Sequence, residues 1–217
     1  MQTAAQVVLI TGGTSGIGLA LAVRFHQAGN TVIVTGRDQG RLEAVQSQLP
    51  AVRVERADMS DRAALDRLAS AHPDVTVLVH NAGVQDAYAL ADPTVTAERI
   101  EHELAINLLG PIHLTRRMLP RLLEQREAAV VVVTSTLALL PKASAPVYCA
   151  SKAGLRAFAQ ALRGQVVGTP VRVFELIPPL VDTPMTAGRG QGKIAPEAVA
   201  AAFWRGFAAD REEIRVG

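Results

Sequence analysis

The chain has 217 residues, and its 22 Lys and Arg residues against 20 Asp and Glu residues give a formal net charge of +2. A nearly neutral chain without a basic stripe is not typical of a nucleic-acid-binding protein. Its single cysteine, Cys149, excludes an internal disulfide framework and a cysteine-rich metal site. The first apolar run, at 7–10, is too short for a secretory signal, and no run is long enough to span a bilayer. We therefore expect a cytoplasmic protein, with no membrane partner and no metal.

Six short apolar runs rich in β-branched residues alternate with longer segments that have helical spacing. The runs lie at 7–10, 31–34, 52–55, 75–80, 130–134 and 171–176, and we expect a last strand within 211–217. Strands that are apolar throughout are typical of a sheet covered on both faces. Because strands and helices alternate, right-handed crossovers are expected between parallel strands, which predicts an α/β fold. The predicted fold is a doubly wound parallel sheet with helices on both faces, and it forms one domain over residues 1–217.

Several helix boundaries can be predicted from capping residues. Ser60 and Thr96 each precede a segment with helical spacing, so both are expected to be N-caps. Pro196 suits the first turn of a helix at 197–208. The segment at 183–196 is rich in Gly and Thr, and we expect it to be a flexible loop beside the substrate.

The first strand leads into TGGTSGIG at 11–18, which opens the first helix. Glycines let a backbone turn sharply and approach a phosphate, and a helix N-terminus supplies N–H donors to it. A glycine cluster can also be an ordinary turn, and the motif is not the strict G-x-G-x-x-G pattern. Its place between strand and helix favours a Rossmann-type dinucleotide site, whose expected contacts are Gly12, Thr14, Ser15, Gly16, Ile17 and Gly18.

The end of the second strand indicates which dinucleotide is bound. An acid there holds the ribose 2′-hydroxyl of NAD, whereas an arginine accommodates the 2′-phosphate of NADP. Here Gly36 takes the place of the acid and Arg37 follows, so NADP(H) is predicted over NAD(H), although Asp38 could still serve an NAD ribose. Asp58, after the third strand, could meet the adenine or simply begin a helix.

Tyr148 and Lys152 are four residues apart in a segment with helical spacing, so their side chains are expected on one face. A free tyrosine titrates near pH 10, so it exchanges protons at neutral pH only beside a cation that favours the phenolate. The chain has three lysines and two tyrosines, which makes this pairing more than compositional background. Cys149 points to another side of the helix and is expected to pack in the core.

In order and spacing, these motifs resemble the short-chain dehydrogenases/reductases over nearly the whole chain. The motifs are TGGTSGIG at 11–18, DMS at 58–60, NAG at 81–83, NLLG at 107–110, TSTLA at 134–138, YCASK at 148–152 and IPPLVDTPM at 177–185. The last of these, with NLLGPIHLT, is similar to a DltE-like branch. Pro179 stands where the family usually has glycine, which stiffens the turn without removing cofactor binding.

The resemblance implies roles for individual residues. Tyr148 is expected to be the general acid or base, Ser135 to hydrogen-bond the reacting oxygen, and Lys152 to hold the nicotinamide ribose and lower the pKa of Tyr148. Asn107 is expected to support a water that relays protons to the lysine. The remaining cofactor contacts implied are Asp58, Met59, Asn81, Ala82, Gly83, Pro178, Val181 and Thr183.

We therefore predict an NADP(H)-dependent oxidoreductase that interconverts a ketone or aldehyde and its alcohol, acting as a homodimer or homotetramer. The residues expected around the substrate are mostly apolar, which favours a hydrophobic carbonyl compound: Val84, Gln85, Leu137, Ala138, Leu139 and Met185. One alternative is a non-catalytic regulatory protein of the same fold that senses NADPH. An epimerase or dehydratase is disfavoured because no extended substrate domain is present.

Overall fold

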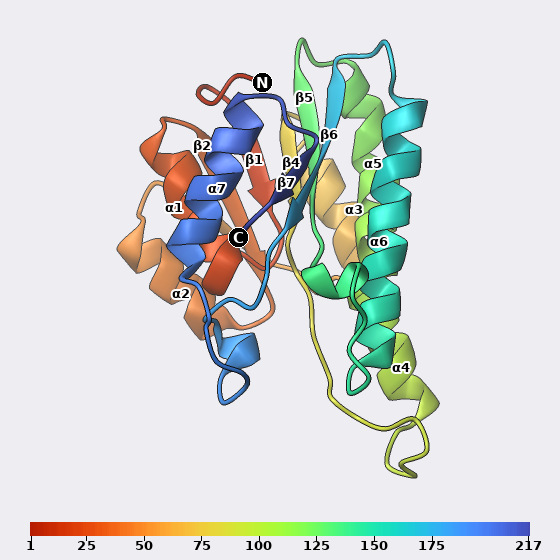
Figure 1. The fold of residues 1–217 in the computed structure, drawn as a ribbon. Helices are drawn as coiled ribbons and strands as arrows, with labels where there is room; N and C mark the ends of the chain where they lie inside the picture. The colour runs from red at the N-terminus through yellow and green to blue at the C-terminus, as the bar shows by residue number, and fades with distance from the viewer.

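The computed structural model describes all 217 residues. Its centre is a wholly parallel seven-stranded sheet with the order β3-β2-β1-β4-β5-β6-β7 (Figure 1). The strands are β1 (Val7–Ile10), β2 (Thr31–Gly36), β3 (Arg53–Arg56), β4 (Val77–His80), β5 (Ala128–Val133), β6 (Val171–Ile177) and β7 (Glu213–Arg215). The predicted α/β fold is confirmed, and every expected strand is present within a few residues of its expected bounds.

Helices cover both faces of the sheet. One layer contains α1 (Gly16–Gln27), α2 (Gln39–Gln48) and α7 (Pro196–Ala208), seen at the left of Figure 1. The other contains α3 (Arg62–Ala71), α5 (Gly110–Leu123) and α6 (Pro146–Gln165). α4 (Ala97–Leu104) continues through the π-helix η1 (Ala105–Leu109) into α5, and α6 is the longest helix, with 20 residues. None of the helices combines the length and the apolar character needed to cross a membrane.

The apolar strands separate two hydrophobic cores. Alternate residues of β1 divide between them: Val8 and Ile10 face the layer of α1 and α7, whereas Leu9 faces the layer of α3, α5 and α6. On the α1 side, Phe25 packs against Phe203 and Phe207, with ring centroids 5.9 and 5.8 Å apart. Burial on both faces is the physical reason why these strands show no polar alternation.

One predicted helix boundary is wrong. Thr96 and Pro196 lie where they were expected, at the N-cap of α4 and the first residue of α7. The N-cap of α3, however, is Asp61, whose carboxylate accepts from the N–H of Ala63. Ser60 instead donates its hydroxyl to Asp58 Oδ1, over 2.7 Å. Asp and Ser are about equally good N-caps, so α3 could begin after either Ser60 or Asp61, and in the structure it begins after Asp61.

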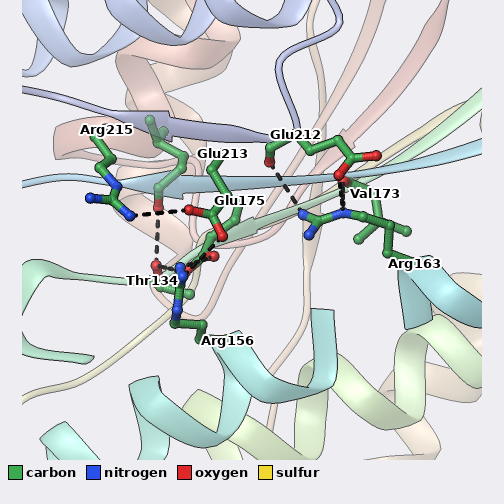
Figure 2. A network of polar contacts seen from close by, with 9 residues as sticks. Thr134, Arg156, Arg163, Val173, Glu175, Glu212, Glu213 and Arg215 are labelled. Atoms are coloured by element: carbon green, nitrogen blue, oxygen red, sulfur yellow. Dashed lines mark hydrogen bonds and ion pairs between the residues drawn. The ribbon is translucent and has the colours of Figure 1, made fainter. Parts of the chain in front are cut away.

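A charged network joins α6 to the β6 and β7 edge (Figure 2). The carboxylate of Glu175, on β6, is fully buried, and it pairs with Arg156 of α6. Glu175 also accepts the hydroxyl of Thr134 over 2.7 Å, while Arg156 reaches Glu213 of β7 over 2.9 Å. This network lies behind Ser135, the residue that follows Thr134. It therefore connects the helix that carries Tyr148 and Lys152 to the strand end that carries Ser135.

Candidate active site

A cavity of about 510 Å³ opens at the carboxyl ends of the strands. Ligands of open parallel sheets bind at this edge, outside the strand ends. The loops after β4, β5 and β6 extend below the sheet on this side in Figure 1. All the predicted site residues line the cavity except Gly18 and Asn107, which lie behind its wall.

The glycine turn is built by close backbone contacts. Gly12 has a φ of +64°, and a Cβ there would lie 2.7 Å from Cα of Ala82. A Cβ on Gly18 would lie 2.4 Å from Nδ2 of Asn81, so Gly18 has a packing role. Asn81 Nδ2 donates to the carbonyls of Thr11 and Gly12 over 3.0 and 2.9 Å. The loop after β4 thus holds the turn in place, and the first turn of α1 faces the cavity without a side-chain cap.

The end of the cavity beside β2 is rich in arginine. Arg37 and Arg41 both line it, and the side chain of Arg37 is half exposed. Asp38, the acid that could have served an NAD ribose, instead caps α2 and accepts the N–H of Arg41 over 2.8 Å. Arg41 was missed in the sequence, although its place one helical turn after Arg37 is a usable signal.

Asp58 lines the same end, and its oxygen accepts the backbone N–H of Ser60 over 2.8 Å. Burial raises the pKa of Asp58, but hydrogen bonds from Ser60 outweigh it and hold the pKa below its usual value. Both of the alternatives for Asp58 are therefore compatible with the structure, since the carboxylate begins a turn and also faces the cavity.

Tyr148 and Lys152 lie on one face of α6, and both are buried. Nζ of Lys152 is 5.8 Å from the centroid of the Tyr148 ring and donates to the carbonyl of Val133 over 2.9 Å. Val133 ends β5, two residues before Ser135. The hydroxyl of Ser135 accepts the N–H of Leu137 over 3.1 Å, which starts the short helix η2 (Thr136–Ala138). The three side chains thus meet at one wall of the cavity.

Burial controls the protonation of both groups in α6. It raises the pKa of Tyr148 to about 12, and a polar contact with Ser135 opposes the rise. Burial also lowers the pKa of Lys152 to about 8. The expected lowering of the Tyr148 pKa is therefore not seen in this structure, because desolvation outweighs the hydrogen bond with Ser135 and the charge of Glu103 also disfavours the phenolate. A phenol that keeps its proton at neutral pH is a proton donor.

Asn107 lies within the π-helix η1 and is fully buried. Its Oδ1 accepts the N–H of Val84 over 2.9 Å, and its Nδ2 donates to Val84 O and Ser151 Oγ over 2.8 and 3.1 Å. The amide is thus occupied within the protein and fixes the loop after β4. Residue 111 is proline, which has no N–H, so the main-chain carbonyl of Asn107 lacks the usual helical donor four residues on. That carbonyl is the group of Asn107 with capacity to hold a water.

The substrate side of the cavity differs from the apolar pocket that we expected. Val84, Gln85, Leu137 and Met185 do line it. Ala138 and Leu139 do not, and Leu139 is exposed by 41%. Two cations that the sequence did not point to are also in the wall, Lys142 and Arg189. Neither has a motif around it, so only the folded loops place them there.

The donor set suits a dinucleotide phosphate. N–H groups at the start of α1 would donate to phosphate oxygens, and Arg37 and Arg41 add positive charge at one end. A Cβ on Gly83 would lie 3.1 Å from Oδ1 of Asn107 and 3.5 Å from Nζ of Lys152, so the glycine lets the loop after β4 approach both side chains closely. The residues present therefore fit a nicotinamide dinucleotide along the strand ends.

Comparison with known proteins gives a consistent result. Residues 6–193 match the family model described as short chain dehydrogenase. The chain is 42% identical to the uncharacterized oxidoreductase DltE of Bacillus subtilis over 187 residues, 84% of this chain and 74% of that protein. It is 36% identical to the NADP-dependent 3-hydroxy acid dehydrogenase YdfG of Salmonella typhi over 180 residues, 81% of this chain and 72% of that protein.

Solved structures agree with this result. A short chain dehydrogenase from Burkholderia cenocepacia in complex with NADP superposes with a TM-score of 0.91 at 26% identity, covering 100% of this chain and 90% of that one. A short chain dehydrogenase/reductase from Burkholderia phymatum in complex with NAD gives 0.92 at 25% identity, with the same coverage of both chains. A nicotinamide cofactor is common to both neighbours, and its phosphorylation state differs between them.

Proposed function

This chain belongs to the short-chain dehydrogenase/reductase family of oxidoreductases, and on that basis we propose that it interconverts a ketone or aldehyde and its alcohol with NADP(H). The observation that carries this proposal is the meeting of Ser135, Tyr148 and Lys152 at the wall of the cavity that the glycine turn also lines. A protein that only senses NADPH has no use for a buried lysine beside a buried phenol, since burying both costs stability.

The proposed reduction uses the chain's own residues for proton transfer. The bound cofactor supplies a hydride to the carbonyl carbon. The Tyr148 phenol gives its proton to the carbonyl oxygen, while the Ser135 hydroxyl hydrogen-bonds the same oxygen and orients it. The ammonium of Lys152 then stabilises the phenolate until a proton returns, and a water on the Asn107 carbonyl is the relay that we propose for that step. Oxidation of the alcohol runs in reverse, with Tyr148 as the base.

Three features support NADP(H) over NAD(H). Arg37 and Arg41 line the adenosine end, where a 2′-phosphate would lie. Asp38 is committed to capping α2 and is poorly placed to bind a ribose 2′-hydroxyl. The Salmonella relative is named as NADP-dependent. Asn81, Ala82 and Gly83 are proposed to line the cofactor after β4, and Pro178, Val181 and Thr183 to hold the amide of the nicotinamide.

We also propose that residues 183–196 form a flexible loop whose opening admits the substrate, and that the chain assembles as a homodimer or homotetramer. Support for assembly comes from Leu109 and Leu123, which are exposed by 43% and 40% on the η1–α5 segment. Sedimentation analysis would decide the second point, and a single species with the mass of one chain would refute it.

The experiment is to follow NADPH consumption by the purified protein with aliphatic, aromatic and bulky ketones and aldehydes. In the Tyr148→Phe variant we expect turnover to fall by about two to four orders of magnitude, because the proton donor is lost. NADPH affinity should change little, as the phenol contributes only part of a long site. If the variant turned over carbonyl compounds as fast as the parent chain, the proposed mechanism would be wrong.

A further inference from the structure

Arg189 extends from the segment between β6 and α7 into the wall of the cavity, and its side chain is half-buried. Its guanidinium donates to Gln85, on the loop after β4, through Nη1 to Oε1 over 3.1 Å and Nη2 to the backbone carbonyl over 3.3 Å. Both acceptors are uncharged. A guanidinium has five N–H donors, so several remain for another group.

No carboxylate of the chain neutralises Arg189. Two other acids, Asp86 and Glu103, are engaged elsewhere and do not line the cavity: Asp86 pairs with Arg99 over 3.1 Å, and Glu103 accepts the hydroxyl of Tyr88 over 3.1 Å. Lys193, the other cation of the same segment, pairs with Asp182 over 3.3 Å and lies outside the cavity wall. Arg189 is therefore a cation held in place by neutral groups and directed into the cavity.

The charges along the cavity are distributed unevenly. Its two acidic wall residues, Asp38 and Asp58, follow β2 and β3, whereas Arg189 follows β6 on the other side of the central strands β1 and β4. Lys142, on the loop after β5, adds a second cation on the substrate side and forms no ion pair. The substrate side of the cavity wall thus has positive charge and no carboxylate, although the charge of Glu103, which does not line the cavity, also acts on Tyr148.

Arg189 is close enough to the reacting centre to act on it. Arg189, Ser135 and Tyr148 line the same cavity, and the charge of Arg189 opposes that of Glu103 in its effect on the Tyr148 pKa. A group bound by the guanidinium would therefore lie near the atom that exchanges a proton with Tyr148. The planar fork of an arginine matches the two oxygens of a carboxylate better than any other anion-binding side chain does.

We propose that the substrate of this chain carries a carboxylate near its reacting carbonyl or hydroxyl group, and that Arg189 binds that carboxylate. The inference deepens the proposed function and rests on it. The carboxylate is a spectator: the hydride adds to the carbonyl carbon and the Tyr148 proton to its oxygen, while the carboxylate keeps its charge. Arg189 is then a specificity-determining residue that selects oxo acids and hydroxy acids over neutral ketones and alcohols.

The test compares 2-, 3- and 4-oxo acids with their methyl esters as substrates of NADPH oxidation. We expect at least one acid to exceed its ester in kcat/KM. Loss of one charge-assisted hydrogen-bonding partner predicts that Arg189→Gln lowers kcat/KM for that acid by about ten- to a hundredfold more than kcat/KM for its ester, mainly through KM. Arg189→Lys should restore part of the preference, since it restores the charge.

Lys193→Gln is the matched control, because it removes a cation of the same segment that does not line the cavity. Any disturbance of the segment should change acid and ester together and leave their ratio as it was. If esters react as well as acids in the parent chain, or if Arg189→Gln leaves the ratio unchanged, the inference is wrong while the proposed function stands.

A binding measurement separates this inference from turnover. Butyrate and butyramide, which cannot be reduced, are titrated by calorimetry into the protein saturated with NADP⁺. Butyrate should bind more tightly than butyramide, and Arg189→Gln should abolish the difference. Equal binding of the two would overturn the inference. If no carbonyl compound is reduced, the proposed function fails, and this titration still decides whether Arg189 is a carboxylate site.

Discussion

Arg156→Met removes the cation that neutralises Glu175, and it is predicted to destabilise the chain strongly. Glu175 is fully buried, while the side chain of Arg156 is only 16% exposed, so the carboxylate would remain in the interior without its partner. Removing one partner of a buried ion pair costs about 3–5 kcal/mol in the free energy of unfolding. Thr134 still donates to Glu175 over 2.7 Å, so the lower value, about 3 kcal/mol, is expected.

Urea denaturation followed by far-ultraviolet circular dichroism measures this change, at one fixed protein concentration because assembly would add to stability. For a chain of this size, a loss of about 3 kcal/mol corresponds to a fall in Tm of roughly 6–12 °C. The slope of the free energy against urea should not change, since the native fold is retained.

Two further variants test the reasoning. Arg215→Met removes a cation from the exposed side of the same network, where Arg215 is 66% exposed and pairs with Glu213 over 3.4 Å. That substitution should lower the free energy of unfolding by less than about 1 kcal/mol. The double variant Arg156→Met with Glu175→Met removes both buried charges and should recover most of the loss. If Arg156→Met lowers the free energy of unfolding no more than Arg215→Met does, then burial of Glu175 does not make its ion pair with Arg156 important for stability.

Two more predictions concern the cavity. Lys152→Met should raise the free energy of unfolding at neutral pH by about 3–4 kcal/mol and abolish turnover, because burial lowers the Lys152 pKa from 10.5 to about 8 and each unit corresponds to about 1.4 kcal/mol. Between these pH values the unfolded chain binds more protons at Lys152 than the folded chain, so the stability of the parent chain should rise with pH, and the variant should lack that contribution. Urea denaturation of both proteins at pH 8 and 10.5 tests the sign of this change. The same dependence of stability on pH in the parent chain and the variant would contradict it. The double variant Arg37→Met with Arg41→Met should bind NADPH about tenfold or more weakly and NADH almost unchanged, since charge-assisted hydrogen bonds to the 2′-phosphate are lost. Fluorescence titration with both nucleotides measures the two affinities. An equal loss of affinity for both would remove the basis for an NADP preference.

The sequence by itself determined the fold and most of the candidate site. Unbroken apolar strands, alternating with helices, require a parallel sheet covered on both faces. The carboxyl ends of such strands meet at one edge, so residues that follow them, such as Gly12, Asn81 and Ser135, have to converge there whatever their separation in the chain. The spacing of Tyr148 and Lys152 then places both on one face of a helix.

The tertiary structure decided what local spacing does not encode. Whether Ser60 or Asp61 caps α3, and where the side-chain amide of Asn107 points, depend on near-equal alternatives that packing resolves. The deep burial of Lys152, which sets its pKa, arises from the fit of α6 against β5. Arg189 lies 104 residues from Gln85 in the chain, and only the path of the loops after β4 and β6 brings them together. Long loops have many accessible conformations, so contacts between them are selected by the whole fold rather than by the residues beside them.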